Sequence, residues 1–252
     1  MEYLRGWRAL RKDPQWITKV LIGTLFSLIP VVGPIVVTGW LSLALRRAVS
    51  GQDAPLPRLD FDFEYLKNLV MAGFKGFLAQ LLWSLPLVVV FMGAYAGCIV
   101  SAVVIAGASR SSGDDPGLAM LIVALVFCVV MPILIIGASL PLNIARMRAE
   151  ITDDLGAARI KEVFGMTRLM MKELIVGQLV LMCIGFGVLL PFGLITLTLG
   201  LYPAAIVMQV IATYWLAEVY RRYLEKGGEP LPVGPLEVPG TVPAPQAPPP
   251  QL

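Results

Sequence analysis

The chain has 252 residues, of which 57% are hydrophobic and 15% charged, and its formal net charge is +3. Its mean hydropathy of +0.78 excludes an ordinary water-soluble domain, which is about 45–50% apolar and about 25% charged. The absence of histidine excludes histidine acid–base catalysis, histidine metal ligands and His-dependent triads. We therefore expect an all-α, polytopic helical membrane protein with one helical membrane domain over residues 1–226.

An apolar run from Ile17 to Leu45 follows the charged N-terminal segment. A straight helix of about 29 residues would be about 44 Å long, whereas a hydrocarbon core is about 30 Å thick. Basic residues flank the run on both sides, so the positive-inside rule places both flanks in the cytoplasm. Pro30, Gly33 and Pro34 would break it. We predict a re-entrant hairpin over about residues 17–48; the alternative is one kinked, tilted span.

Four further apolar stretches are each long enough to cross a membrane, and they lie at about residues 77–108, 118–145, 174–190 and 200–217. Of the lysines and arginines, only Arg110 lies in a joint assigned to the outside. Short cytoplasmic loops carry the excess of Lys and Arg, so both termini are predicted to be cytoplasmic. The expected location is the cell membrane, crossed several times.

Amphipathic segments precede the apolar ones, at about residues 2–12, 61–76 and 153–172. In each, apolar residues recur at helical spacing while charged residues occupy other angles, which is typical of helices that lie in the membrane interface. Their basic residues are candidates for contact with anionic lipid headgroups, namely Arg5, Arg8, Lys67, Lys75, Arg159, Lys161, Arg168 and Lys172.

The last 26 residues, 227–252, contain nine prolines and almost no large apolar groups. Such a composition cannot form a packed core. We predict a disordered, proline-rich cytoplasmic tail with polyproline II character. A docking role for a groove that binds proline-rich peptides is the alternative to a plain solvated tail.

Polar side chains inside a membrane are the usual indicator of function. The candidates are amides and one acid near the membrane entrances, namely Gln80, Asn143, Gln178, Gln209 and Glu218. Amides in spans more often join helices than bind substrates, and we expect Glu218 to pair with Arg221 and Arg222. No catalytic residue, metal ligand or cofactor motif is recognised, and the three cysteines lack metal-ligand spacing.

Several short motifs occur in a fixed order between Lys12 and Phe77. They read Asp13-Pro14-Gln15-Trp16, Ile29-Pro30-Val31-Val32-Gly33, Arg46-Arg47, Gly51-Gln52-Asp53-Ala54-Pro55-Leu56-Pro57 and Asp60-Phe61-Asp62-Phe63. As a set they resemble the prokaryotic membrane family known as domain of unknown function 4013, and "DDLGAARIKEVF" (153–164) is similar to another of its segments. The resemblance implies a polytopic helical membrane protein and supplies no activity.

Two functions fit the sequence. The first is a non-enzymatic membrane scaffold, or lipid-interacting protein, whose interfacial helices bind anionic headgroups. The second is a small permease or channel subunit in which the proline-broken hairpin lines a cavity. The expected partners are membrane lipids, with a homo-oligomer or another membrane protein left open, and no nucleic acid.

Overall fold

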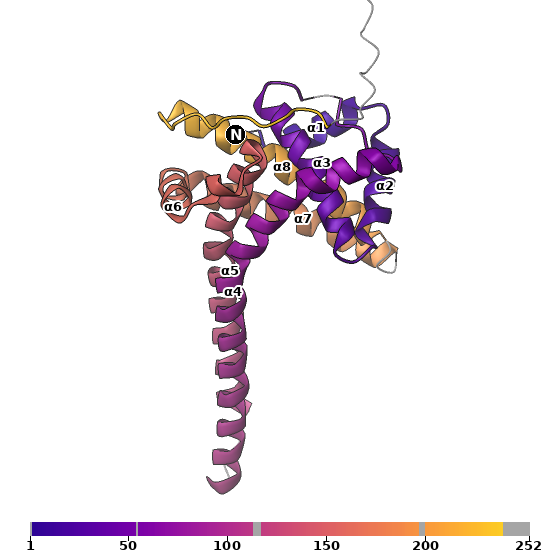
Figure 1. The fold of residues 1–252 in the computed structure, drawn as a ribbon. Coiled ribbons are helices and arrows are strands. Elements are labelled where there is room, and N and C mark those ends of the chain that lie inside the picture. Colours follow the sequence, from indigo (N-terminus) through magenta and orange to yellow (C-terminus); the bar gives the residue numbers. More distant parts are fainter. Residues whose placement is uncertain (1, 54, 113–116, 197–199, 239–252) are drawn as a thin grey trace, which may run out of the picture.

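The computed structural model describes residues 2–53, 55–112, 117–196 and 200–238. Over these residues the chain is all-helical, with eight α-helices and no strand. Figure 1 shows two parts, a body of packed helices and a long arm made of two helices that run side by side away from it. The elements, in chain order, are α1 Arg5–Lys12, α2 Trp16–Ser27, α3 Val32–Val49, α4 Phe63–Ser112, α5 Gly117–Thr152, the 3-10 helix η1 Leu155–Ala158, α6 Ile160–Leu169, α7 Met171–Ile195 and α8 Leu201–Glu225.

The core of the body lies around α3 and α8, which pack against each other. α3 also contacts α2, α4 and α5, and α8 also contacts α1, α2 and α7. Large side chains of both helices are almost fully buried there, among them Trp40 and Tyr214. Because α3 is enclosed by neighbours on most sides, its apolar residues face protein in this fold.

The arm consists of the second part of α4 and the first part of α5, which pack against each other along its length (Figure 1). α4 has 50 residues and contains Pro86, so it would be about 75 Å long if straight. Large apolar side chains on the arm face outward, including Val89 at 71% exposure and Ile133 at 64%. A helix that is apolar all round is typical of a membrane span.

Three helices within the described part of the chain are long and apolar enough to cross a membrane: α3, the portion Phe63–Ile105 of α4, and α8. The number becomes four if α6 and Met171–Gly187, which are bent by 79° at a short break, count as one span. These candidates include the predicted spans at 77–108, 174–190 and 200–217, and they add α3, which the sequence predicts to be part of a re-entrant hairpin.

The expected N-terminal hairpin is present as two helices, but its break lies at residues 28–31, about three residues earlier than predicted. Val31 adopts φ 65°, ψ −58°, and its neighbour Val32 donates a backbone hydrogen bond to the carbonyl of Pro30 at 2.8 Å. This is the geometry of a γ-turn, which is strained for an L-residue. Pro34 is tolerated in the first turn of α3, where its missing N–H has no helical partner to lose.

Two of the expected interfacial helices differ from the structure in their boundaries. Residues 63–76 are the first turns of α4 and continue without a break into the arm, because no Pro or Gly interrupts the helix at that point strongly enough to end it. Residues 153–172 divide into η1 and α6, and α7 begins at Met171. The third, α1, is a separate short helix as expected.

The first part of the segment predicted to be a disordered tail, residues 227–238, lies along the body as a strap (Figure 1). Gly234 donates a backbone hydrogen bond to Ile151 at 2.8 Å, Leu231 donates one to the Tyr220 hydroxyl at 2.8 Å, and Val238 is buried. The non-proline residues between the prolines keep their N–H groups, and these groups hold the strap against the body. Residues 239–252 lie outside the described residues.

Candidate functional site

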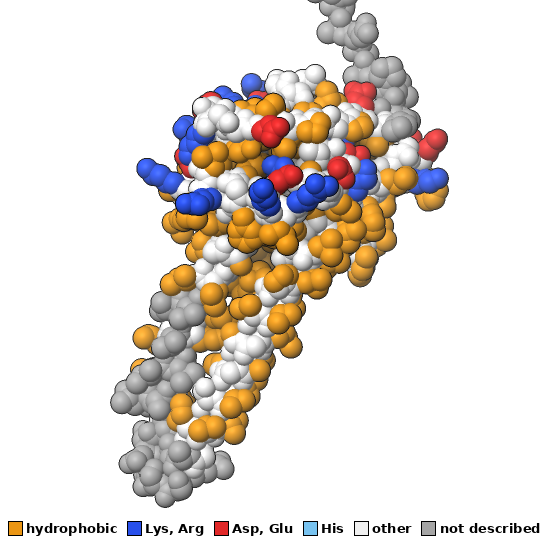
Figure 2. Space-filling model, turned by 60° about the vertical axis from the view of Figure 1, so that its left-hand side comes forward, with side chains coloured by type: hydrophobic (Ala, Val, Ile, Leu, Met, Phe, Trp, Pro, Cys, Tyr) orange, Lys and Arg blue, Asp and Glu red, His pale blue; other side chains and the backbone are white. Residues whose placement is uncertain are grey.

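Charged side chains gather at one end of the body, away from the arm. Figure 2 shows a band of Lys, Arg, Asp and Glu above an apolar surface that continues along the arm. Several of these charges are buried, and burying a charge is costly unless it is paired. The pairs therefore have to be described before any of these residues is assigned to a ligand.

The first buried pair joins Asp13 and Lys19, whose carboxylate Oδ2 and ammonium Nζ are 2.6 Å apart. Asp13 also accepts a hydrogen bond from the backbone N–H of Leu56 at 2.9 Å, and Lys19 donates to the carbonyl of Leu56 at 2.8 Å. Trp40 donates from Nε1 to the carbonyl of Pro57 at 3.0 Å. The Asp-Pro motif and the Pro-Leu-Pro motif thus meet in space, and their polar groups serve the fold.

A second cluster surrounds Arg46, which is 1% exposed. Its guanidinium donates to the carbonyl of Glu150 at 2.6 Å, to the carbonyl of Pro235 at 3.1 Å and to the carboxylate of Asp153 at 2.8 Å. Lys75 contacts the same carboxylate at 3.0 Å. One side chain therefore joins the end of α3, the end of α5 and the strap.

Arg5 of α1 lies between two acids. It contacts Asp53 at 2.6 Å and the buried Glu218 at 3.5 Å. The hydrogen bond to Asp53 raises the pKa of Arg5 above its ordinary value, against the opposing effect of burial. Glu218 also pairs with Arg221 at 2.7 Å, as the sequence predicts. Its second partner is Arg5, however, and not Arg222, because α1 packs against this face of α8.

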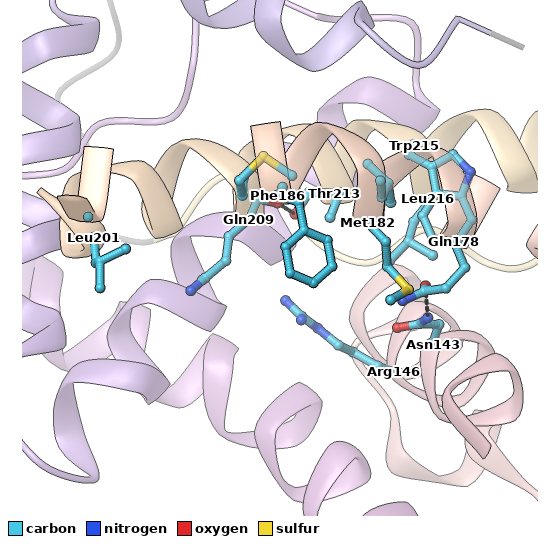
Figure 3. A pocket seen from close by; sticks show the side chains of 15 residues that line it. Asn143, Arg146, Gln178, Met182, Phe186, Leu201, Gln209, Thr213, Trp215 and Leu216 are labelled. Carbon is cyan, nitrogen blue, oxygen red and sulfur yellow. Dashed lines mark hydrogen bonds between the residues drawn. The ribbon is translucent and has the colours of Figure 1, made fainter. Parts of the chain in front are cut away.

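A pocket of about 770 Å³ between α5, α7 and α8 combines an apolar wall with several polar side chains. Most of its lining is apolar, with Leu181, Met182, Phe186, Leu201, Met208 and Leu216 among the residues. Its polar side chains are Asn143, Arg146, Gln178, Gln209 and Thr213. Figure 3 shows Arg146 extending across the pocket toward Phe186 and Gln209.

Three of the predicted intramembrane polar residues meet in this pocket. Asn143 Nδ2 donates to Gln178 Oε1 at 3.3 Å, so these two amides join α5 to α7 (Figure 3). Gln209 lies on α8 and lines the same pocket, although Gln178 bonds Asn143 and not Gln209. Gln80 is half-buried on α4 and Glu218 is in the charged end; neither lines the pocket.

Sequence reasoning missed Arg146 and Glu150, which form an ion pair at 2.6 Å on one face of α5. Glu150 is 1% exposed, and its second oxygen, Oε2, has no hydrogen-bond partner within the described residues. The signal was available, because an Arg and a Glu four residues apart on a helix are neighbours. It was overlooked because both residues lie just beyond the end of the predicted span at residue 145.

The predicted headgroup contacts divide into two groups. Arg5, Arg8 and Lys75 are paired with acids, Arg8 with Glu2 at 2.7 Å. The others are exposed and form no ion pair with any described residue, namely Lys67, Arg159, Lys161, Arg168 and Lys172. Four of these five lie at or beside α6, where Ile160 and Phe164 are also exposed at 70% and 54%. This is the composition of a helix at a membrane surface.

The hairpin-break residues do not line the pocket. The structure instead gives Gly33 a packing role: a Cβ on it would lie 1.8 Å from the carbonyl oxygen of Phe26, so only glycine lets α3 start against the end of α2. Among the residues that the structure describes, no group of three or more Cys, Asp or Glu side chains could hold a metal ion. Cys98, Cys128 and Cys183 are free thiols.

Comparison with known proteins gives one result. A family model described as "Protein of unknown function (DUF4013)" matches residues 22–198, more than half of the chain. The matched region runs from within α2 to beyond the end of α7 and includes the arm. No curated protein and no solved structure matches the chain.

Proposed function

The chain belongs to the DUF4013 family, and on this premise we propose that it is a non-enzymatic membrane scaffold that contacts lipids. The family description names no activity, so the proposal rests on the residues of this chain. The arm and part of the body would sit in the bilayer, and the charged end would lie at the cytoplasmic headgroups. The protein would hold and shape that leaflet without transporting solute.

The single observation that carries the proposal is the separation of charged and apolar surface in Figure 2. The arm exposes many large apolar side chains over its whole length, and soluble proteins rarely expose contiguous apolar surface of more than a few hundred Å². Lipid would cover it. An apolar cavity of about 810 Å³ at the base of the arm, beside α6, would also be filled by acyl chains.

Orientation follows from the same separation. Arg110, near the end of α4, is the only Lys or Arg between residues 76 and 145, and α1 and the strap both lie at the charged end (Figure 1). We therefore place both termini in the cytoplasm. In this orientation α2, which is about 18 Å long, is too short to cross, and the α2–α3 pair would be a re-entrant hairpin.

Cysteine labelling tests the orientation. In a chain with Cys98, Cys128 and Cys183 replaced by serine, single cysteines are placed at Glu2, Val32 and Ser112. A membrane-impermeant maleimide added outside intact cells should label Ser112→Cys and leave Glu2→Cys and Val32→Cys unmodified. Labelling of Val32→Cys from outside would contradict a hairpin that enters only part of the bilayer.

Reconstitution into vesicles tests the scaffold. The purified chain should float with vesicles containing anionic lipid, change their size distribution and cause no leak of a trapped dye. Reversing three exposed charges, K161E/R168E/K172E, should reduce the effect, because each well-placed basic residue contributes about 1 kcal/mol at an anionic surface. The variant K161R/R168K/K172R keeps the charges and should behave as the natural chain.

The same vesicles test the competing function. A permease or channel subunit would produce a reproducible ion or solute flux, and substitutions at Gln178 or Gln209 would abolish it. Such a flux would overturn the scaffold proposal. Turnover of lipid in the same preparation would overturn the non-enzymatic part of the proposal. The oligomeric state of the chain is measured in parallel, and a homo-oligomer is compatible with the scaffold.

A further inference from the structure

We propose that the pocket between α5, α7 and α8 binds one anionic phospholipid, with the phosphate on Arg146 and an acyl chain along the apolar wall. This inference deepens the proposed function, on which it rests, by naming the lipid class and the residues that select it. It differs from general surface attraction, because it concerns a single bound molecule in a defined pocket.

The first support is the state of the Arg146 guanidinium. Its Nε donates to Glu150 at 2.6 Å, while its two Nη groups have no hydrogen-bond partner among the described residues, and the side chain is 21% exposed. An arginine offers five N–H donors in a planar fork that matches a phosphate. The donors that remain point into the pocket, toward Phe186 and Gln209 (Figure 3).

Glu150 explains why the guanidinium keeps this direction. Its carboxylate is buried beneath Arg146, and α4 holds it in place, since a Cβ on Gly76 would lie 2.8 Å from Glu150 Cγ. Glu150 is therefore a positioning residue that fixes one edge of the guanidinium and leaves the other edge for an anion. The Glu150 carboxylate also competes with a bound anion for the positive charge of Arg146.

The second support is the rest of the lining. Asn143 and Gln178 bond each other through one donor and one acceptor, so each keeps groups that can bond the oxygens of a glycerol backbone. Beyond them the wall is apolar, with Met182, Phe186 and Leu216. A volume of about 770 Å³ is within the range of ligand pockets, about 300–1,000 Å³.

The third support is the depth of the pocket. Arg146 lies one residue beyond the apolar stretch of α5 that ends at residue 145, and the paired charges of the body begin immediately after it. A cation at this level lies where lipid phosphates are found. The apolar wall extends from Arg146 toward Leu201 at the start of α8 (Figure 3). An amphiphile with one charged end and one apolar chain fits this arrangement.

The experiment uses the full chain in mild detergent with an equimolar mixture of phosphatidylglycerol and phosphatidylcholine of identical acyl chains. Native mass spectrometry counts the lipids retained. We expect one tightly bound lipid and a preference for phosphatidylglycerol of about tenfold, because both lipids offer the phosphate but the choline of phosphatidylcholine brings a second cation close to Arg146. Excess inorganic phosphate should not displace it, because the phosphate ion lacks the chain; displacement would overturn a lipid site in favour of a simple anion site.

Removing Arg146 alone would leave Glu150 buried without a partner, so the test replaces both. The double variant R146Q/E150Q keeps two groups that can bond each other, and its preference should fall to about twofold or less. E150Q keeps the cation and removes its competitor, so the preference should be equal or greater. The matched control is R58Q/D62N, an exposed pair of opposite charges with the same spacing, far from the pocket in the chain, which should retain the natural preference.

A212F tests the apolar wall independently of charge, because it adds a ring to a small residue that lines the pocket. It should reduce the retention of both lipids, and thermal unfolding shows that each variant is folded. Equal retention of the two lipids by the natural chain, or an unchanged preference in folded R146Q/E150Q, would overturn the inference. The scaffold proposal has separate readouts, namely flotation with vesicles, the size distribution of the vesicles, and solute flux.

Discussion

Gly39 of α3 and Gly73 of α4 face each other so closely that neither position has room for a side chain. A Cβ on Gly39 would lie 2.1 Å from the carbonyl oxygen of Leu69, and a Cβ on Gly73 would lie 2.5 Å from the backbone nitrogen of Gly39. Both obstacles are backbone atoms, which cannot rotate away. The two helices are therefore in direct backbone contact, and this contact fixes α4 where it leaves the body for the arm.

We predict that Gly39→Ala lowers the free energy of unfolding by about 1–3 kcal/mol, the usual cost of overpacking. The helix propensity of alanine would by itself favour the change by about 0.5–1 kcal/mol, so the sign of the result separates packing from propensity. Thermal and denaturant unfolding in detergent measure it. The control is Gly97→Ala on the arm, where no described atom lies within 4 Å; an equal loss there would contradict the explanation.

Arg46 is predicted to be the most sensitive charged residue. Arg46→Ala leaves Asp153 and two carbonyls without their main donor, and removing one partner of a buried pair costs about 3–5 kcal/mol. Arg46→Lys should cost less but should still destabilise, because an ammonium cannot reach the three acceptors in the same fork geometry. Unfolding midpoints measure both variants. Limited proteolysis provides a second readout, since cleavage within residues 227–238 should accelerate as Pro235 loses its bond.

The neighbouring residue, Arg47, is the control for the stability loss expected at Arg46. Arg47 makes only long contacts, at 3.4 Å, to the carbonyls of Pro55 and Leu236 and to Glu237. Arg47→Ala should therefore cost about 1 kcal/mol or less. Equal losses of stability in Arg46→Ala and Arg47→Ala would contradict the conclusion that Arg46 holds α3, the end of α5 and the strap together.

The pair of Asp13 and Lys19 allows a different kind of test. Asp13→Asn leaves the Lys19 ammonium buried with a neutral partner, and we expect a loss of about 3 kcal/mol or more in the free energy of unfolding. The double variant D13N/K19M removes both charges and should recover part of that loss. Denaturant unfolding of the natural chain, both single variants and the double variant gives the coupling energy. Additive losses would show that the two residues act independently.

Substitutions at Val31 and Gly33, two residues apart, are expected to have opposite effects on stability. Val31→Gly should leave stability unchanged or raise it, because glycine adopts φ 65° without the strain that a β-branched residue has there. Gly33→Ala should destabilise, because its Cβ would overlap the carbonyl of Phe26. Unfolding of the two variants in detergent tests the pair. A loss in Val31→Gly larger than in Gly33→Ala would mean that the turn between α2 and α3 is placed incorrectly.

Much of the helical layout could be predicted from apolar runs and basic flanks. The runs at 77–108, 118–145, 174–190 and 200–217 lie within α4, α5, α7 and α8, and the family resemblance is confirmed by the match over residues 22–198. Hydropathy gave no boundary between the interfacial and spanning parts of α4, because an amphipathic segment and an apolar one can share a continuous helix. The sequence predicts the break in the hairpin at Gly33. In the structure Gly33 lies within α3 and allows this helix to start close to the end of α2.

The strap and the pocket could not be predicted in the same way. Residues 227–238 are held by hydrogen bonds of their backbone to a few side chains. Amino-acid composition does not predict which backbone group will bond which side chain. The pocket joins residues from three helices whose relative rotation is set by packing. Asn143, Gln178 and Gln209 are recognisable as polar candidates, but the pocket in which they meet is not. Arg146 lies outside the predicted span, which ends at residue 145, whereas α5 continues to Thr152.

The last helix, α8, completes the packing of α1, so α1 reaches its final packing only after α8 has been made. Gly6 of α1 lies against Ile211 of α8, the hydroxyl of Tyr214 binds the carbonyl of Asp53 at 2.6 Å, and Arg5 reaches Glu218. During synthesis, about 200 residues must leave the ribosome before these partners exist. In the proposed membrane arrangement the arm, whose two helices adjoin in the chain, would enter the bilayer first, and Arg5 would stay solvated until its partner Glu218 is made.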